Sequence, residues 1–139
     1  MSQDLYNTLS ISANGMRAQS ARIKVIAENI ANADTAATSP KGLPYTRKTI
    51  TFKNVLDRQL GTNRVEVSKI GQDTSKPYPT KYMPDHPGAD ANGYVKMPNV
   101  DPLVETMDMQ EAQRSYEANL GMIDQTRSMY SQTVDILRH

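Results

Sequence analysis

The stretch Leu5–Ile30, LYNTLSISANGMRAQSARIKVIAENI, decides the fold because its apolar residues recur at alternating spacings of four and three. The positions in this register hold Leu5, Leu9, Ser12, Met16, Gln19, Ile23, Ile26 and Ile30, and six of these eight residues are apolar. Such spacing places a narrow apolar stripe along one side of a helix, as in the seam of a coiled coil. The stretch therefore predicts a long amphipathic helix that packs against other helices.

The opposite end of the chain repeats this spacing. Its positions hold Met109, Ala112, Tyr116, Asn119, Ile123, Thr126, Tyr130, Thr133 and Leu137. Asp101 can cap the first free backbone donors and Pro102 suits the first helical position, so we predict a helix that begins near Leu103. The first helix should end around residues 29–35, where asparagine, aspartate and threonine favour a turn.

All 8 prolines lie between Pro40 and Pro102, which divides the chain into three parts. Proline disrupts helix interiors because it lacks a backbone donor and clashes with the preceding turn. We therefore predict an N-terminal helical part in residues 1–39, a β-rich, proline-containing middle domain in 40–102, and a C-terminal helical part in 103–139. The predicted fold class is mainly α with a small β-rich insertion, in which long amphipathic helices of coiled-coil type flank a compact middle segment.

The middle part has the composition of short strands. Thr46–Phe52 and Arg64–Ile70 are rich in β-branched residues and are predicted strands, and Tyr94–Met97 is a short third strand after an Asn-Gly turn. Residues 53–63 form a connection that we expect to be too long for a tight hairpin. Ser75–Pro84 is expected to be polyproline-like or an edge strand.

The composition leaves little material for a large core, since only 37% of the 139 residues are hydrophobic and 6% are aromatic. Helices of about 30 and 35 residues would extend roughly 45 to 50 Å, so a pair of them leaves much of each seam uncovered. Two hypotheses follow: an ordinary intramolecular helical hairpin, and an assembly in which other chains cover the seams. The length of the helices favours assembly.

Charge is divided unevenly along the chain. Residues 1–70 carry 10 bases and 5 acids, whereas residues 71–139 carry 6 bases and 10 acids, within a net charge of +1. This division favours pairing between the halves, within one subunit or between neighbours. Arg17, Arg22 and Lys24 are too thin a basic face for a typical nucleic-acid binder, so we expect no nucleic-acid partner.

Catalytic and metal-binding patterns are also missing. The absence of cysteine excludes disulfides, thiolate nucleophiles and cysteine-ligated metals. One loop gathers polar residues of the kinds that bind metals, namely Asp85, His86, Asp90 and Asn92. Aligned with a calcium-binding EF-hand loop, however, Gly88 and Asn99 stand where essential ligands belong. We therefore predict no catalytic, cofactor or metal site and interpret this loop as a set of turns.

Membrane-spanning and secretory segments are not expected either. The longest apolar run is Val25–Ala27, whereas a membrane span needs about 20 residues. The opening residues carry an acid and no apolar stretch, so we expect no secretory signal.

Two consecutive segments, Ile11–Ser20 (ISANGMRAQS) and Val25–Thr35 (VIAENIANADT), resemble the N-terminal signature of the bacterial flagellar axial proteins, which are the rod and hook subunits. At its centre lies the family motif Asn29, Ile30, Ala31 and Asn32, which on its own would indicate only a polar helix end. Further segments in the expected order narrow the resemblance to subunits of the proximal rod. They are Tyr45–Leu60, His86–Asp90, Gly93–Lys96, Pro98–Val100, Met107–Met109 and Arg114–Asn119.

This resemblance implies a structural protein without catalysis. It implies synthesis in the cytoplasm, export through the flagellar type III apparatus without a cleaved signal peptide, and assembly into the rod that crosses the periplasmic space and transmits torque. The implied partners are copies of the chain itself, other proximal and distal rod subunits, the MS-ring–rod junction protein and the export apparatus. In this family the terminal helices pack with those of neighbouring subunits.

Periodicity and resemblance together predict a subunit-assembly seam. Its residues are Leu5, Leu9, Met16, Ile23, Ile26, Ile30, Met109, Tyr116, Ile123, Tyr130 and Leu137. Two alternatives remain open: a cytoplasmic adaptor or export chaperone, which would also present amphipathic helices, and a membrane-surface helix based on Arg17, Arg22 and Lys24. Cellular location separates the first from a rod subunit, and binding to anionic liposomes tests the second.

Overall fold

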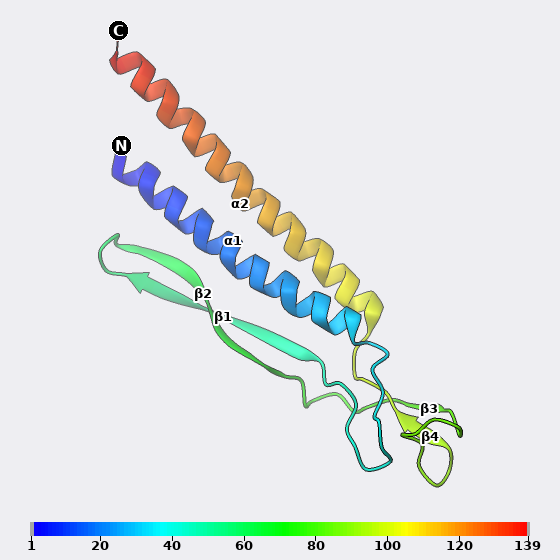
Figure 1. Ribbon diagram of the computed structural model, residues 1–139. Helices are drawn as coiled ribbons and strands as arrows, with labels where there is room; N and C mark the ends of the chain where they lie inside the picture. Colours follow the sequence, from blue (N-terminus) through cyan, green and yellow to red (C-terminus); the bar gives the residue numbers. More distant parts are fainter. Residues whose placement is uncertain (1, 139) are drawn as a thin grey trace. The chain divides into compact units, whose positions relative to one another are not determined.

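The computed structural model describes residues 2–138, in which two long helices bracket four strands (Figure 1). Helix α1 spans Ser2–Ala31 and helix α2 spans Pro102–Leu137. The strands between them are β1 (Lys48–Asp57), β2 (Thr62–Gln72), β3 (Thr80–Tyr82) and β4 (Tyr94–Lys96). The predicted arrangement of two long terminal helices with a small β region between them is confirmed.

Both predicted inner helix ends are confirmed by their hydrogen bonds. At the end of α1, the backbone N–H of Asn32 and its side-chain Nδ2 both donate to the Glu28 carbonyl, at 3.1 and 2.8 Å. At the start of α2, Asp101 Oδ1 accepts from the N–H groups of Leu103 and Val104, at 3.0 and 3.4 Å. Asp101 therefore caps α2, with Pro102 as its first residue.

The prediction that residues 53–63 are too long a connection for a tight hairpin is wrong. β1 and β2 form a two-stranded sheet, and only residues 58–61 separate them. Asp57 organises the turn, because its Oδ1 accepts from the N–H groups of Gln59 and Leu60 at 3.0 and 3.3 Å. Gly61, with φ 63°, supplies the left-handed conformation that closes the loop.

β3 and β4 form a second, antiparallel two-stranded sheet, in which Thr80 faces Lys96 and Tyr82 faces Tyr94. The two tyrosine rings meet edge to face, with centroids 5.4 Å apart. Gly93, with φ 83°, donates its N–H to the Asp90 carbonyl at 3.0 Å and forms the predicted turn before β4. The proline-rich tract thus contributes an edge strand, which is one of its two predicted forms.

The chain divides into two compact units, each built from separate segments. Unit 1 comprises residues 2–23, 51–69 and 110–138, and unit 2 comprises residues 24–50 and 70–109. The buried side chains of unit 2 include Val25, Ile26 and Val95. Among the described residues of unit 1, the buried ones are all small: Ser12, Ala18, Ala112 and Thr126. The branched apolar core therefore belongs to unit 2.

Candidate functional site

In unit 1, α1 and α2 run in opposite directions and share two cavities. One, of about 210 Å³, is lined by Leu5, Tyr6, Leu9, Thr126 and Tyr130. The other, of about 300 Å³, is lined by Ala13, Met16, Arg17, Ser20, Tyr116 and Ile123. From the first cavity to the second, the residue numbers of α1 rise while those of α2 fall, which establishes the antiparallel order of the two helices within this unit.

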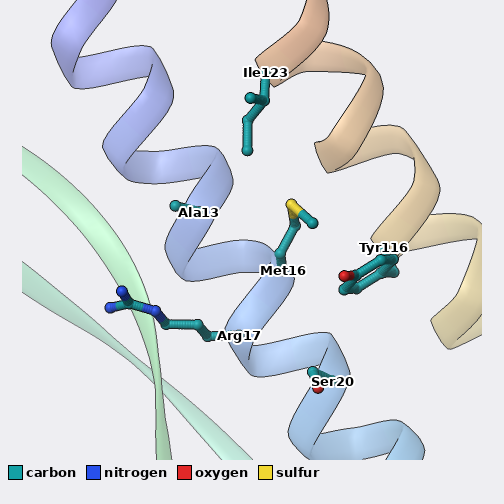
Figure 2. Close-up of a pocket in the computed structure, with 6 residues that line it drawn as sticks. All are labelled: Ala13, Met16, Arg17, Ser20, Tyr116 and Ile123. Atoms are coloured by element: carbon teal, nitrogen blue, oxygen red, sulfur yellow. The ribbon is translucent and has the colours of Figure 1, made fainter.

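Figure 2 shows how the second cavity is built. Met16 reaches from α1 toward α2, where Ile123 and Tyr116 lie one above the other, while Arg17 points to another side of α1. Successive turns of each helix supply the lining, so the two cavities follow one face of the pair. We call the six predicted seam residues that line them the groove: Leu5, Leu9, Met16, Tyr116, Ile123 and Tyr130.

The other predicted seam residues have different surroundings. Ile23 and Leu137 also belong to unit 1, but they line neither cavity, and the Leu137 side chain is 80% exposed. Ile26, Ile30 and Met109 belong to unit 2. Ile26 is only 4% exposed, so this side chain is covered within the subunit itself.

The two helices approach closely at Gly15. A Cβ atom at this position would lie 2.8 Å from Asn119 Nδ2, so the absence of a side chain lets the Asn119 amide sit against α1. Asn119 Nδ2 donates to the Ser115 carbonyl at 3.0 Å. Further along, Arg22 forms an exposed ion pair with Glu111 at 3.4 Å. Gly15 is therefore a close-approach glycine of the helix pair.

In unit 2, Asn29 of the family motif joins the end of α1 to the start of β1. Its Oδ1 accepts from the Lys48 N–H at 2.8 Å and its Nδ2 donates to the Lys48 carbonyl at 2.9 Å. The Tyr45 hydroxyl also donates to Oδ1 at 2.8 Å, and Nδ2 donates to a Glu105 carboxylate oxygen at 3.3 Å. Because Asn29 is 1% exposed, these bonds replace the water that its amide would otherwise bind.

Arg47 occupies the centre of the same region. It donates to the Glu105 carboxylate through Nε, and its other nitrogens lie 3.5 Å from Asp73 Oδ2 and 3.9 Å from Asp108 Oδ2. The Glu105 side chain is only 1% exposed. A carboxylate this deeply buried requires a cation and hydrogen bonds, and Arg47 and Asn29 supply both.

Asn99 connects this group to the remaining segments of unit 2. Its Oδ1 accepts from the Arg47 N–H at 2.8 Å, and its Nδ2 donates to the carbonyls of Asp73 and Lys76, at 2.8 and 3.3 Å. We call the four side chains Asn29, Arg47, Asn99 and Glu105 the polar junction. They come from α1, the segment before β1, the segment before α2 and α2 itself.

Ionisable groups beside the polar junction have shifted pKa values. The Glu28 carboxylate accepts a hydrogen bond from Lys48 Nζ at 2.8 Å, which lowers the pKa of Glu28 and raises that of Lys48. Hydrogen bonds from Ser75 lower the pKa of Asp73. Burial raises the pKa of the Tyr45 hydroxyl. The ionised forms of both carboxylates are therefore favoured in the folded chain.

The loop considered for metal binding is organised by bonds to its own backbone. His86 Nδ1 accepts from the Gly88 N–H at 3.0 Å, and Asp90 Oδ1 accepts from the N–H groups of Asn92 and Tyr94, at 2.9 and 3.0 Å. These are the turn-forming roles that the sequence suggested. Within residues 2–138, no three histidine, aspartate or glutamate side chains gather as a metal site would require.

Sequence reasoning missed three members of the polar junction, Arg47, Asn99 and Glu105. Two of them lie in segments that carried the family resemblance, Tyr45–Leu60 and Pro98–Val100, which was the available signal. Glu105 looked like an ordinary acidic residue in the first turn of a helix. Its role depends on Asn29, which is 76 residues away along the chain.

Comparison with known proteins supports the resemblance to flagellar rod subunits. Residues 9–36 match the family described as flagella basal body rod protein, and residues 91–136 match the family described as flagellar basal body rod FlgEFG protein C-terminal. The chain is 47% identical over 128 residues to the flagellar basal-body rod protein FlgC of Agrobacterium fabrum, an alignment that covers 92% of this chain and 91% of the relative. The chain belongs to the FlgC family of flagellar basal-body rod proteins.

More distant FlgC proteins match over nearly their whole length as well. The protein from Salmonella typhimurium is 39% identical over 132 residues, which cover 95% of this chain and 97% of the relative. The protein from Bacillus subtilis is 36% identical over 146 aligned positions, which cover 94% and 97%. The predicted membership of the rod family is therefore confirmed, and this family is structural rather than enzymatic.

Neither α1 nor α2, over the residues that the structure describes, is long and apolar enough to cross a membrane.

Proposed function

We propose that this FlgC-family subunit forms part of the proximal rod by assembling with copies of itself and with other rod subunits through its terminal helices. The groove is the observation that carries this proposal. Six predicted seam residues line two open cavities on one face of the helix pair, where side chains of a neighbouring helix would fit. Tyr130 is 57% exposed in the single subunit.

Unit 1, over the residues that the structure describes, has no interior of large apolar side chains. Its buried residues are small, whereas large apolar side chains of α1 and α2 remain exposed. Covering apolar surface contributes about 25 cal/mol per Å², so contacts with neighbouring helices would stabilise unit 1. Knobs-into-holes packing of the coiled-coil type would bury the 4-3 stripes of both helices.

The three predicted parts of the chain have separate roles in this proposal. Residues 1–39 and 103–139 act as assembly helices, and residues 40–102 form the middle part between them, which contributes Arg47 and Asn99 to the polar junction. A drive shaft must pass torque from one subunit to the next, and several helix contacts per subunit would resist slippage better than a single one.

The proposal also includes the route to the rod. The subunit is made in the cytoplasm, leaves through the flagellar type III apparatus without a cleaved signal peptide, and joins the rod in the periplasmic space. There it contacts the MS-ring–rod junction protein and the proximal and distal rod subunits. The support is the family membership.

Electron microscopy of basal bodies, combined with a swimming assay, tests the role. A strain of the source bacterium that lacks the gene is expected to lose rod, hook and swimming, and the intact gene is expected to restore all three. Normal rods in the deletion strain would overturn the proposal and favour a cytoplasmic adaptor instead.

Complementation with variants tests the groove itself. Tyr130→Asp places a charge in the groove at an exposed position, so the subunit should still fold but fail to restore rods. Ser128→Asp adds the same charge at an exposed position of α2 that lines neither cavity, and it should complement normally. Ile26→Asp is a poorer probe, because Ile26 is buried in unit 2 and its loss would disturb the subunit's own core.

A further inference from the structure

Asparagine followed by glycine occurs twice in the chain, at Asn14–Gly15 and at Asn92–Gly93. In such a pair the backbone nitrogen of the glycine can attack the side-chain carbonyl carbon of the asparagine, because glycine has no side chain to hinder the approach. Attack requires the backbone at the pair to leave its regular hydrogen-bonded geometry. The surroundings of the two pairs differ, and this difference predicts where the reaction occurs.

Asn14–Gly15 lies inside helix α1, in unit 1. Backbone N–H groups in the middle of a helix bond to carbonyls four residues earlier, so the Gly15 nitrogen is already engaged. The Asn14 side chain is engaged as well, since its Nδ2 donates to the Ser10 carbonyl at 2.9 Å. Attack at this pair therefore requires the middle of α1 to open.

Asn92–Gly93 lies in the turn before β4, in unit 2 (Figure 1). The Asn92 side chain is exposed and makes no hydrogen bond to any of residues 2–138. The Gly93 N–H donates to the Asp90 carbonyl at 3.0 Å, so a bond within one short turn restrains the attacking nitrogen. A short turn opens by local fluctuation more readily than the middle of a long helix.

The fold itself requires glycine after Asn92. Gly93 has a φ of 83°, a conformation that residues with a side chain rarely adopt. A Cβ atom at this position would lie 2.8 Å from Tyr82 Cε2, and the Tyr82 ring also packs edge to face on Tyr94. The residue that makes Asn92 reactive is therefore also the one that lets the chain enter β4.

We propose that Asn92 is a site of spontaneous deamidation in the folded subunit, whereas α1 protects Asn14. The Gly93 nitrogen loses its proton to a solvent base and bonds to Asn92 Cγ, and the bond between Cγ and Nδ2 breaks. The departing nitrogen takes a proton from water and leaves as ammonia, which leaves a succinimide ring. Water then opens the ring to aspartate or to isoaspartate, in which the main chain runs through Cγ. This inference is independent of the proposed rod function.

Isoaspartate would disturb the second sheet, because it adds a methylene group to the main chain at the entrance to β4. The Gly93 carbonyl accepts from the Met83 N–H at 2.9 Å, a bond that depends on the spacing at this point. Val95, which pairs with Lys81 of β3, is fully buried. An additional main-chain atom shifts these groups relative to β3, so the modified subunit should lose hydrogen-exchange protection in β3 and β4.

Timed incubation of the full-length chain in neutral buffer, followed by peptide mass spectrometry, tests the proposal. Peptides with residue 92 should change in mass from amide to acid at least about tenfold faster than peptides with residue 14. Labelling by a methyltransferase specific for isoaspartate should mark the same peptides. In denaturant, where neither pair is restrained, the two rates should become similar. Equal rates in the folded chain, no conversion at residue 92, or a difference that persists in denaturant would overturn the proposal.

Asn92→Gln is the matched control, because glutamine keeps an exposed amide but would have to form a larger and less favourable ring. This variant should fold like the unaltered chain and show no conversion at residue 92. Its β3 and β4 amides should keep their protection from hydrogen exchange throughout the incubation, whereas those of the unaltered chain should lose it as conversion proceeds. The same loss of protection in both chains would overturn the effect assigned to isoaspartate.

Discussion

Unit 1 and unit 2 differ in the interactions that stabilise each of them internally. Unit 2 buries branched apolar side chains and also contains the directional hydrogen bonds of the polar junction. Unit 1 buries only small residues among those described and leaves its larger apolar side chains in open cavities or on the surface. The comparison teaches that one region fixes its geometry within the subunit, whereas the other leaves apolar surface exposed, which the proposed contacts with neighbouring subunits would cover.

The largest expected effect comes from opening the polar junction. Glu105→Ala leaves Arg47 without its buried partner and removes an acceptor of Asn29, so the free energy of unfolding of unit 2 should fall by about 3 to 5 kcal/mol. Glu111→Ala, the matched change in unit 1, breaks an ion pair whose carboxylate is 69% exposed and should cost less than about 1 kcal/mol. Hydrogen exchange under denaturant, followed separately for amides of each unit, measures both. Equal losses would contradict the difference between the two units.

Removal of the motif amide should have the next largest effect. Asn29→Ala leaves the N–H and carbonyl of Lys48 without these side-chain bonds, and we expect unit 2 to lose about 1 to 3 kcal/mol. Asn32→Ala removes a more exposed amide that bonds the Glu28 carbonyl, so its cost should be smaller. Denaturant unfolding of both variants gives the comparison, and a larger loss at Asn32 would refute the importance assigned to Asn29.

Alanine substitutions at two glycines of unit 1 test how closely its helices approach. Apart from the adjacent backbone of α2, no atom would lie within 4 Å of a Cβ at Gly121, so Gly121→Ala should stabilise α2 by about 1 kcal/mol through helix propensity alone. The same change at Gly15 forces the Asn119 amide to move, and its gain should be smaller or reversed. Thermal unfolding of the two variants distinguishes them, and equal gains would argue against close helix approach at Gly15.

The smallest effect concerns pH and the Glu28–Lys48 ion pair of unit 2. Since the pKa of Glu28 is lowered from its ordinary value of 4.5, the unfolded chain binds this proton more readily than the folded chain. The stabilisation from Glu28 is therefore complete above about pH 4.5 and is lost as pH falls through the lower folded pKa. Glu28→Gln should be less stable than the unaltered chain at pH 7 and should converge with it in acid. Denaturant midpoints measured across this pH range would contradict the assignment if the difference stayed constant.

Local patterns predicted the elements whose causes are local. The 4-3 stripe predicted both long helices, and Asp101 with Pro102 predicted the start of α2. A helix and its cap depend on residues only a few positions apart. The tight β1–β2 turn was not predicted. The Asp57 carboxylate accepts from the N–H groups of the turn, and the sequence pattern did not reveal these bonds. The polar junction could not be predicted, because its side chains come together only after distant segments have packed.

The seam was predicted by periodicity, yet periodicity does not say what covers each position. Ile26 and Tyr130 satisfy the same spacing, but one is 4% exposed and the other 57%. Ile26 belongs to unit 2 and Tyr130 to unit 1, and the stripe of α1 itself runs from unit 1 into unit 2. A single stripe can therefore serve the subunit's own core along one part and remain available to neighbours along another.

The bonds between Asn29 and Lys48 also bear on aggregation. The amide of Asn29 engages both the N–H and the carbonyl of Lys48, and so takes the place that an adjoining strand would occupy at the start of β1. Unpaired strand edges recruit strands from other molecules and can seed fibrils. A helix residue that occupies these groups keeps them from a stray chain, so loss of the Asn29 amide would favour misassembly as well as weaker folding.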